Sequence, residues 1–288
     1  YGAKEKELLK VGVHVLPKFP KDTTDRNRTS PFAFTGNKFE FRMLGSSASV
    51  ALPNTVLNTA VAEILMQYAD VLEGASDFTA ALHDLIKSEI KAHKRIIFNG
   101  NGYDDAWLAE AEKRGLSNLK ETPDAVAHYL DKKNVDLFTS HKVYSEIEMQ
   151  SRHEVFLDKY CKLLHIEAMT MLEMAKQDIL PAVSSYSSTL AENILSKDQL
   201  GIKSEFESKT LEDISADMKT AYEAYQALAE SIVKVEDEED LVAKADTYKD
   251  TIKSEMEALR DACDKLETET AAEFWPFPTY GELLFAVR

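Results

Sequence analysis

The side chains of this sequence that could do chemistry together are concentrated near its beginning. Residues 38–43 read Lys-Phe-Glu-Phe-Arg-Met, and this strict alternation of charged and apolar side chains is typical of a β-strand with two different faces. Such a strand would place Lys38, Glu40 and Arg42 on one face, and a polar loop that carries Arg28 precedes it. Guanidinium groups bind phosphate through paired hydrogen bonds, and a carboxylate can bind a divalent cation. The combination predicts a site for phosphate and metal; the alternative is a surface strand with a solvated charged face.

A short strand and the loop before it must position these side chains. The alternation predicts that Phe39 and Phe41 are buried on the apolar face of the strand. Residues 22–36 are expected to form a loop. Residues 45–47, Gly-Ser-Ser, suit a turn that ends the strand.

The rest of the chain has helical spacing. Apolar residues recur every three or four positions from Val56 to Tyr68 and from Phe78 to about His93. Asn99-Gly-Asn-Gly102 lacks the third glycine of a nucleotide-binding loop and the ligand order of a calcium loop, so we interpret it as a helix stop followed by a new N-cap at Asp104. Ser145 and Glu148 have the spacing of a capping box, and the helix that they begin is expected to end at Pro181.

Two later stretches have coiled-coil spacing. Apolar positions from Leu211 to Val235 alternate steps of three and four, and a second series runs from Leu241 to Leu266 with one extra step of four between Ile252 and Met256. The acidic residues 236–240 separate the two series. The pattern predicts an antiparallel helical hairpin over residues 205–268, and the fold class expected for the whole chain is α+β, predominantly α-helical.

Charge and hydropathy exclude several classes of protein. The net charge is −16, but residues 1–45 hold nine Lys and Arg against five Asp and Glu, so the basic part coincides with the predicted anion site. An acidic chain of this kind argues against non-specific nucleic-acid binding, and no apolar run approaches the ~18 residues that span a bilayer. Cys161 and Cys263 are expected to be buried reduced thiols in a cytoplasmic protein. The methionines of residues 169–174 fit a helical core better than a soft-metal site, and neither His153 nor His165 has the spacing of a metal ligand.

Residues 25–42 resemble the C-terminal end of the glutamine synthetase active site, and they are most similar to the type III, long-chain branch. Their sequence is Asp-Arg-Asn-Arg-Thr-Ser-Pro-Phe-Ala-Phe-Thr-Gly-Asn-Lys-Phe-Glu-Phe-Arg. The likeness continues through residues 98–103, the helix of 163–180 and the ending Trp-Pro-Phe-Pro-Thr-Tyr-Gly of 275–281. A complete enzyme of this type is far longer, and the first residue is tyrosine, so we expect a C-terminal portion. The resemblance implies that residues 1–75 form the end of the catalytic domain, with an edge of its sheet, and that residues 76–288 form the type III helical region.

The resemblance also implies a role for each candidate residue. Glu40 matches a metal-binding glutamate, and Arg42 matches the arginine that contacts glutamate and the transferring phosphoryl group. Arg28 matches a loop arginine that contacts ATP phosphates and substrate, and Lys38 stands where an arginine near the nucleotide is common. Ala33 departs from the pattern, because the family often has an arginine there.

The function that the resemblance implies is ATP-dependent ligation of glutamate and ammonia through a γ-glutamyl phosphate, with Mg²⁺ or Mn²⁺. It further implies a homo-oligomer, most plausibly a dodecamer of stacked rings, with active sites between subunits, so this portion alone should be inactive. The competing hypothesis is a non-catalytic helical scaffold that retains an ancestral strand. No nucleic-acid or membrane partner is expected.

Overall fold

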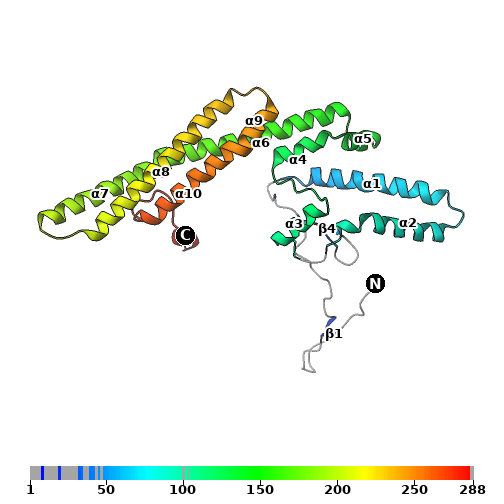
Figure 1. Cartoon of the computed structure of the whole chain (residues 1–288), viewed down its shortest axis with the longest axis horizontal. Helices are drawn as coiled ribbons and strands as arrows, with labels where there is room; N and C mark the ends of the chain where they lie inside the picture. Colours follow the sequence, from blue (N-terminus) through cyan, green and yellow to red (C-terminus); the bar gives the residue numbers. More distant parts are fainter. Residues whose placement is uncertain are drawn as a thin grey trace. The chain divides into compact units, whose positions relative to one another are not determined.

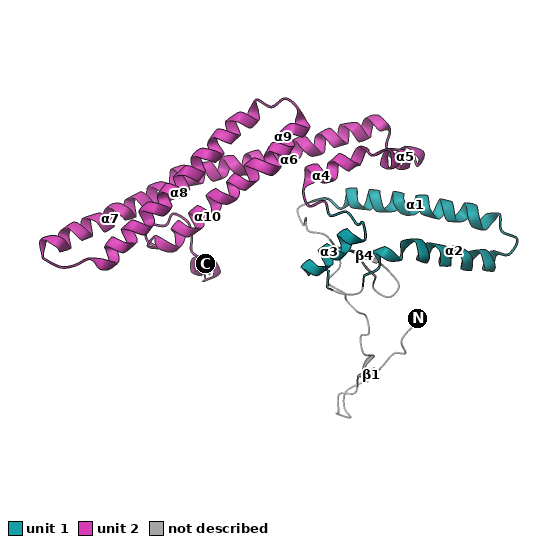
Figure 2. Ribbon diagram, viewed as in Figure 1, with its two compact units in different colours: residues 1–118 teal, residues 119–288 magenta. Residues whose placement is uncertain are grey.

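The computed structural model describes residues 8–9, 19–20, 32–34, 39–42, 45, 48–98, 101–102 and 104–285. These residues are predominantly helical, as the sequence predicts, and they divide into two compact units, residues 1–118 and 119–288 (Figure 2). The division follows packing alone, so the expected domain boundary near residue 75 stays a prediction.

The described residues of the first unit form two short antiparallel strand pairs, three α-helices and one 3₁₀ helix (Figure 1). Strand β1 (Leu8–Leu9) pairs with β2 (Phe19–Pro20), and β3 (Phe32–Phe34) pairs with β4 (Phe39–Phe41). The predicted strand is present as β4, but the expectation of an uninterrupted loop over residues 22–36 is wrong, because Phe-Ala-Phe pairs with β4 as a second strand. An apolar three-residue run between polar segments is too short to distinguish from a loop by periodicity.

Helices α1 (Ala51–Glu73) and α2 (Phe78–His93) form a helical hairpin, followed by the short 3₁₀ helix η1 (Lys94–Ile96) and by α3 (Asp105–Lys113). The predicted N-cap at Asp104 is confirmed, because its side chain accepts a hydrogen bond of 3.0 Å from the backbone N–H of Ala106.

The second unit begins with α4 (Thr122–Ala127), the 3₁₀ helix η2 (His128–Leu130) and α5 (Lys132–Ser140). A long helical run follows: α6 (Glu146–Met174), the π-helix η3 (Ala175–Ile179) and α7 (Leu180–Gln199). The capping box at its start is confirmed, since Ser145 Oγ accepts from Glu148 N and Glu148 Oε2 accepts from Ser145 N at 2.8 Å.

The chain then reverses direction twice. Helix α8 (Glu205–Glu236) packs beside α7, and the run of α9 (Leu241–Thr247), π-helix η4 (Tyr248–Ile252) and α10 (Lys253–Glu269) packs beside α8 and α6 (Figure 1). The three runs enclose one continuous core. Its fully enclosed side chains include Leu157, Val183, Ile214, Leu228, Tyr248, Ile252, Leu259 and Leu266.

Pro181 does not end its helix, so that expectation is wrong. The helical run continues through it to Gln199, with only Leu180 between the π-helix of residues 175–179 and the proline. Proline cannot donate a backbone hydrogen bond and its ring crowds the preceding turn; a π-helix widens that turn and lets the chain continue.

Both π-helices coincide with an interruption of the coiled-coil spacing. Buried positions in the first run step by four twice in succession, from Ala175 to Ile179 and from Ile179 to Val183. In the third run the same interruption follows Tyr248, where the sequence shows one extra step of four. One added residue in a helix would rotate all later side chains out of the seam, and the wider π turn absorbs it. The core therefore remains continuous on both sides.

The aromatic C-terminal segment folds back onto the bundle, as expected from its apolar content. Trp275 and Phe277 pack against the core, and the ring of Phe274 lies 5.2 Å from that of Tyr186. The segment continues into the short helix α11 (Tyr280–Phe285). Cys161 and Cys263 are both free and buried, which confirms the prediction for the two thiols.

Candidate functional site

Strand β4 brings together two of the four residues predicted to do chemistry. Arg42 Nη2 donates to Glu40 Oε2 at 2.6 Å, and Arg42 Nε donates to the same oxygen at 3.2 Å. Arg42 directly follows β4, and its contact with Glu40 places the two side chains on the same side of the chain, as the sequence predicts. Arg28 and Lys38 lie outside the described residues, and their roles stay predictions.

Phe41 is 43% exposed, so the expectation that it is buried opposite the charged face is wrong. A pair of three-residue strands has too little surface to bury a side chain by itself, and burial of such a face requires a further packed layer. The alternation of the sequence correctly sets which side chains share a face, but it does not supply that layer. The side chain of Phe39 lies outside the part of the chain that the structure describes, so its burial stays a prediction.

The strand pairing gives Ala33 a defined position relative to the site. Ala33 of β3 is the direct cross-strand partner of Glu40 of β4. Directly opposed residues of an antiparallel pair belong to the same face of the pair. Position 33, where the resembling family often has an arginine, therefore adjoins the carboxylate that would bind metal.

Glu40 and Arg42 can each leave their mutual ion pair to bind a ligand of opposite charge. The Glu40 and Arg42 side chains are 38% and 31% exposed, so their mutual ion pair contributes on the order of 1 kcal/mol or less. A divalent cation binds a carboxylate more strongly than that, and a phosphate binds a guanidinium through paired hydrogen bonds. The two groups can thus exchange each other for a metal ion and an anion. Among the described residues no group of three or more His, Cys, Asp or Glu side chains could hold a metal ion, so the metal role of Glu40 stays a prediction.

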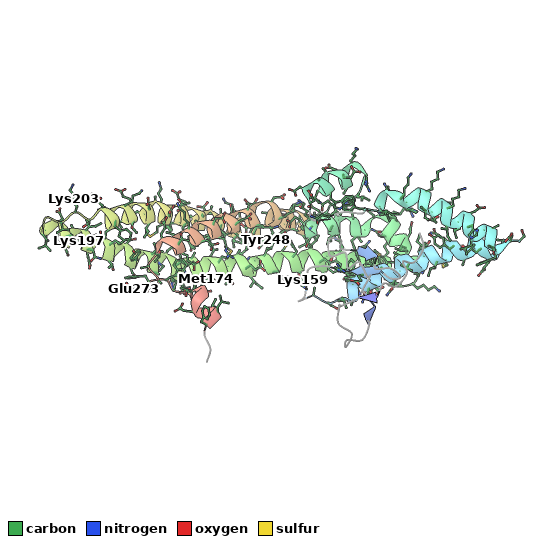
Figure 3. The ribbon with its side chains drawn as sticks, turned by 90° about the horizontal axis from the view of Figure 1, so that it is seen from below. Lys159, Met174, Lys197, Lys203, Tyr248 and Glu273 are labelled. Atoms are coloured by element: carbon green, nitrogen blue, oxygen red, sulfur yellow. The ribbon has the colours of Figure 1, made fainter. Side chains whose placement is uncertain are left out.

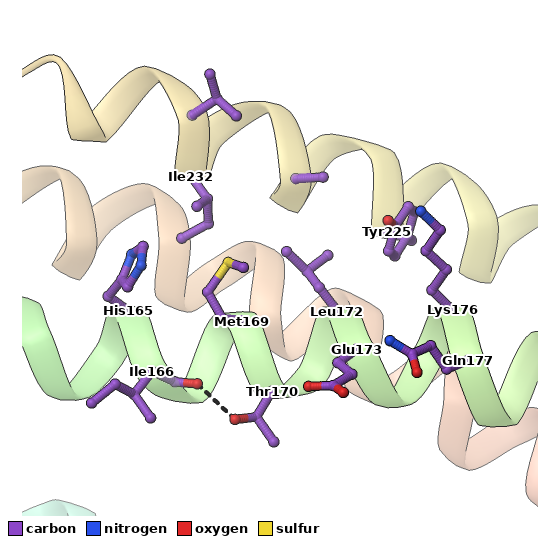
Figure 4. A pocket seen from close by; sticks show the side chains of 12 residues that line it. His165, Ile166, Met169, Thr170, Leu172, Glu173, Lys176, Gln177, Tyr225 and Ile232 are labelled. Carbon is purple, nitrogen blue, oxygen red and sulfur yellow. Dashed lines mark hydrogen bonds between the residues drawn. The ribbon is translucent and has the colours of Figure 1, made fainter.

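The second unit contains a groove that the sequence does not predict. It lies between α6–η3 and α8, and its apolar lining includes Met169, Leu172, Ala229 and Ile232. Thr170, Glu173 and Gln177 lie along one edge, and Lys176 extends toward Tyr225 (Figure 4). His165 lies at one end, and Tyr225 comes from the opposite helix. The groove contains no pairing of a nucleophile with a base, so it carries no argument for catalysis.

His165 joins three helical runs at the end of this groove. Its Nδ1 lies 3.0 Å from the Tyr248 hydroxyl of η4, and its Nε2 lies 3.7 Å from Glu236 Oε1 at the end of α8. Tyr248 is almost fully enclosed, and burial raises the pKa of Tyr248 to about 12. These partners are 83 residues apart in the chain, so no local pattern could have revealed the contact, and it supports a structural role for His165 rather than the metal role that the sequence also argues against.

Comparison with known proteins extends over nearly the whole chain. A glutamine synthetase from Butyrivibrio fibrisolvens is 36% identical over 94% of this chain, and one from Bacteroides fragilis (strain YCH46) is 35% identical over 98%. A type-3 glutamine synthetase from Dictyostelium discoideum is 34% identical over 96% of the chain. The chain is a relative of the glutamine synthetases.

The family relationship has a defined extent. Residues 81–198 match the glutamine synthetase C-terminal domain, which covers α2 to α7. The chain spans about two fifths of the length of these curated relatives, from 39% to 40%. Across the ranges described by the structure, no helix has the length and apolar content to cross a membrane.

Proposed function

We propose that this chain is the C-terminal portion of a glutamine synthetase, an ATP-dependent glutamate–ammonia ligase. The single observation that carries the proposal is the contact of Glu40 with Arg42 at the end of β4, in a chain that is similar to glutamine synthetases over almost all of its length. A scaffold that merely kept an ancestral strand has no need to hold a carboxylate and a guanidinium together.

The reaction transfers the γ-phosphoryl group of ATP to the side-chain carboxylate of glutamate, and ammonia then displaces phosphate from the γ-glutamyl phosphate. Arg42 would hold the glutamate carboxylate and stabilise charge on the transferring phosphoryl group, because a guanidinium forms paired hydrogen bonds with either anion. Arg28 would contact the ATP phosphates and the substrate, and Lys38 would contact the nucleotide.

Glu40 would provide one ligand of Mg²⁺ or Mn²⁺, which when bound neutralises the phosphates and lowers the barrier to phosphoryl transfer. The Arg42 side chain 2.6 Å away would keep the Glu40 carboxylate oriented before metal binds. Displacement of Arg42 from Glu40 on metal binding would free the guanidinium for the anionic substrate.

The proposed complete protein is larger than this chain and oligomeric. Large apolar side chains of α1 and α2 are exposed in the first unit, among them Val61, Leu65, Phe78 and Ile90, and surfaces of this kind are normally covered by further protein. We infer that the complete protein is a homo-oligomer, a dodecamer, in the cytoplasm. The domain division at residue 75, the partial active site and the inactivity of the isolated chain belong to the same proposal.

Glu40→Gln in the complete protein tests the proposed metal role, with Glu73→Gln at the exposed end of α1 as the matched control. We expect the Mg²⁺ concentration that gives half-maximal ligase activity to rise at least ~10-fold in the first variant, because the amide is a far poorer ligand for a hard cation. The control should match the wild type. An unchanged Mg²⁺ dependence would remove Glu40 from the ligands and favour the scaffold hypothesis.

Two physical measurements test the other parts of the proposal. Calorimetric titration of the 288-residue chain with ATP and Mg²⁺ should give weak binding or none, and micromolar binding would mean that the chain holds a complete site. Mass measurement of the complete protein should give a large oligomer, and a fully active monomer would contradict the assembly.

A further inference from the structure

The turn between α7 and α8 carries an apolar surface that the proposed catalytic role does not explain. Four large apolar side chains lie within twelve residues of each other and are strongly exposed: Leu195 at 64%, Leu200 at 75%, Ile202 at 54% and Phe206 at 72%. We call residues 195–209 the tip. Connections between helices at the surface are usually polar, and a cluster of exposed large apolar side chains marks a contact surface.

The backbone of the tip is well ordered by its own hydrogen bonds. Gly201 has φ +70°, and the N–H groups of Gly201 and Ile202 donate to the carbonyls of Asp198 and Lys197 at 2.9 and 3.0 Å. This arrangement is a Schellman C-cap, which requires the left-handed conformation that glycine adopts without strain. An ion pair between Lys197 and Glu207 joins the two helices beside the turn. The apolar side chains are therefore presented by a rigid turn, and a partner need not order it.

The charge of the tip differs from that of the helices behind it. Residues 195–209 contain three lysines and three acidic residues, a net charge of zero. Residues 146–194 carry four Lys and Arg against eight Asp and Glu, and residues 210–269 carry seven against eighteen, so their net charges are −4 and −11. Two copies of this bundle would repel each other along their sides and least at the tip. The neutral tip also offers no net attraction to an anionic membrane or to nucleic acid.

Lys203 and Glu205 supply the charge complementarity that a symmetric contact needs. Both side chains are exposed, and neither has an ion-pair partner in the part of the chain that the structure describes. Lys203 lies in the turn and is labelled with Lys197 at the far end of the bundle in Figure 3. We propose that the tip binds the tip of a second copy of this chain about a two-fold axis, with Lys203 of each copy pairing with Glu205 of the other around the apolar side chains. A contact of this type is self-complementary by symmetry.

A charge-swap series on the full 288-residue chain tests the proposal by sedimentation equilibrium at low salt. Lys203→Glu should raise the dissociation constant of self-association about 10-fold, because it faces a glutamate with a glutamate. The double variant Lys203→Glu with Glu205→Lys should return it to within about 3-fold of the wild type, since the pairs re-form with reversed sign. Phe206→Asp should weaken association at least as much as Lys203→Glu, whereas Val242→Asp, an exposed position at the other end of the bundle, should have no effect.

A distance measurement identifies the contact independently of its strength. Cys161 and Cys263 are buried, so a spin label on Gln199→Cys would be selective for the tip. Tip-to-tip contact predicts label separations under about 30 Å, whereas contacts at the other end of the bundle would separate the labels by more than about 50 Å, the length of a 32-residue helix. A chain that stays monomeric, an association that the tip substitutions leave unchanged, a double variant that fails to recover, or labels that remain far apart would each overturn the proposal.

Discussion

Replacing Glu269 with glutamine should make the second unit more stable at neutral pH. Glu269 is the last residue of α10 and faces Asp217 and Asp213 of α8, together with Lys209 and Lys265. Lys265 Nζ lies 2.6 Å from Asp217 Oδ1, and Lys209 Nζ lies 2.6 Å from Asp213 Oδ1. Each aspartate thus already has a lysine, and the carboxylate of Glu269 is the excess negative charge of the cluster.

Burial and the neighbouring Asp217 raise the pKa of Glu269 above its ordinary 4.5. The C-terminal end of a helix also disfavours a negative charge. Glu269 Oε2 and Asp217 Oδ2 are both enclosed and have no hydrogen-bond partner among the described residues. Two ionised carboxylates have no hydrogen to donate to each other. The folded state therefore favours protonation of Glu269, whose proton can form a hydrogen bond with Asp217.

The magnitude follows from the bond that glutamine would form. Its amide N–H can donate to the Asp217 carboxylate, and hydrogen bonds to charged groups contribute about 1.5–3 kcal/mol when buried. The Glu269 side chain is partly exposed, so we expect a gain of about 1–2 kcal/mol in the free energy of unfolding at pH 7.5. For a unit of this size, each kcal/mol raises Tm by about 2–4 °C.

The sign of the pH dependence provides a second readout. The folded state binds the Glu269 proton more tightly than the unfolded state, so this stability contribution is present below pH 4.5 and is lost as the pH rises through the raised pKa. The amide of the Glu269→Gln variant would carry no such proton, and the difference in Tm between variant and wild type should therefore grow between pH 4.5 and pH 7.5.

Scanning calorimetry of the chain at several pH values is the assay, with Glu267→Gln as the matched control. Glu267 is exposed on the same helix, and its replacement should change the free energy of unfolding by less than about 0.5 kcal/mol. A Glu269→Gln variant that is no more stable than this control, or whose added stability does not change with pH, would show that the Glu269 carboxylate does not destabilise the cluster.

Three further substitutions probe the core, a helix cap and the buried hydroxyl. Leu228→Ala should lower the free energy of unfolding in denaturant titrations by about 2–5 kcal/mol, because Leu228 is fully enclosed. Leu195→Ala at the exposed tip should change it by less than about 0.5 kcal/mol, and equal losses in the two variants would contradict the core assignment. Ser145→Ala should cost about 1 kcal/mol and Ser145→Thr less, and an alanine variant with wild-type Tm would show that the capping box does not hold the start of α6. Tyr248→Phe should lower the free energy of unfolding by about 1 kcal/mol, because it loses the hydrogen bond to His165, and the denaturation midpoint measures the change. If neither Tyr248→Phe nor His165→Ala shifts the midpoint, that contact does not contribute to the stability of the bundle.

The sequence determined the features that depend on neighbours within a few positions. The strand at Glu40, the N-cap at Asp104, the capping box at Ser145 and the helical character of residues 51–269 all follow from spacings of two to four residues. The common face of Glu40 and Arg42 belongs here too, because strand geometry alone places them side by side.

Tertiary structure decided what depends on distant partners. Pro181 normally ends a helix, yet packing of its helical run against α8 keeps the run continuous, and a π-helix restores the phase of the buried side chains. The exposure of Phe41 depends on whether another layer covers the strand pair. Three contacts join segments whose sequences show no sign of one another: Ala33 with Glu40, His165 with Tyr248, and Asp217 with Glu269. Local patterns report the conformation that the chain prefers and which residues share a face, whereas the free energy of burying that face is set by the element that covers it.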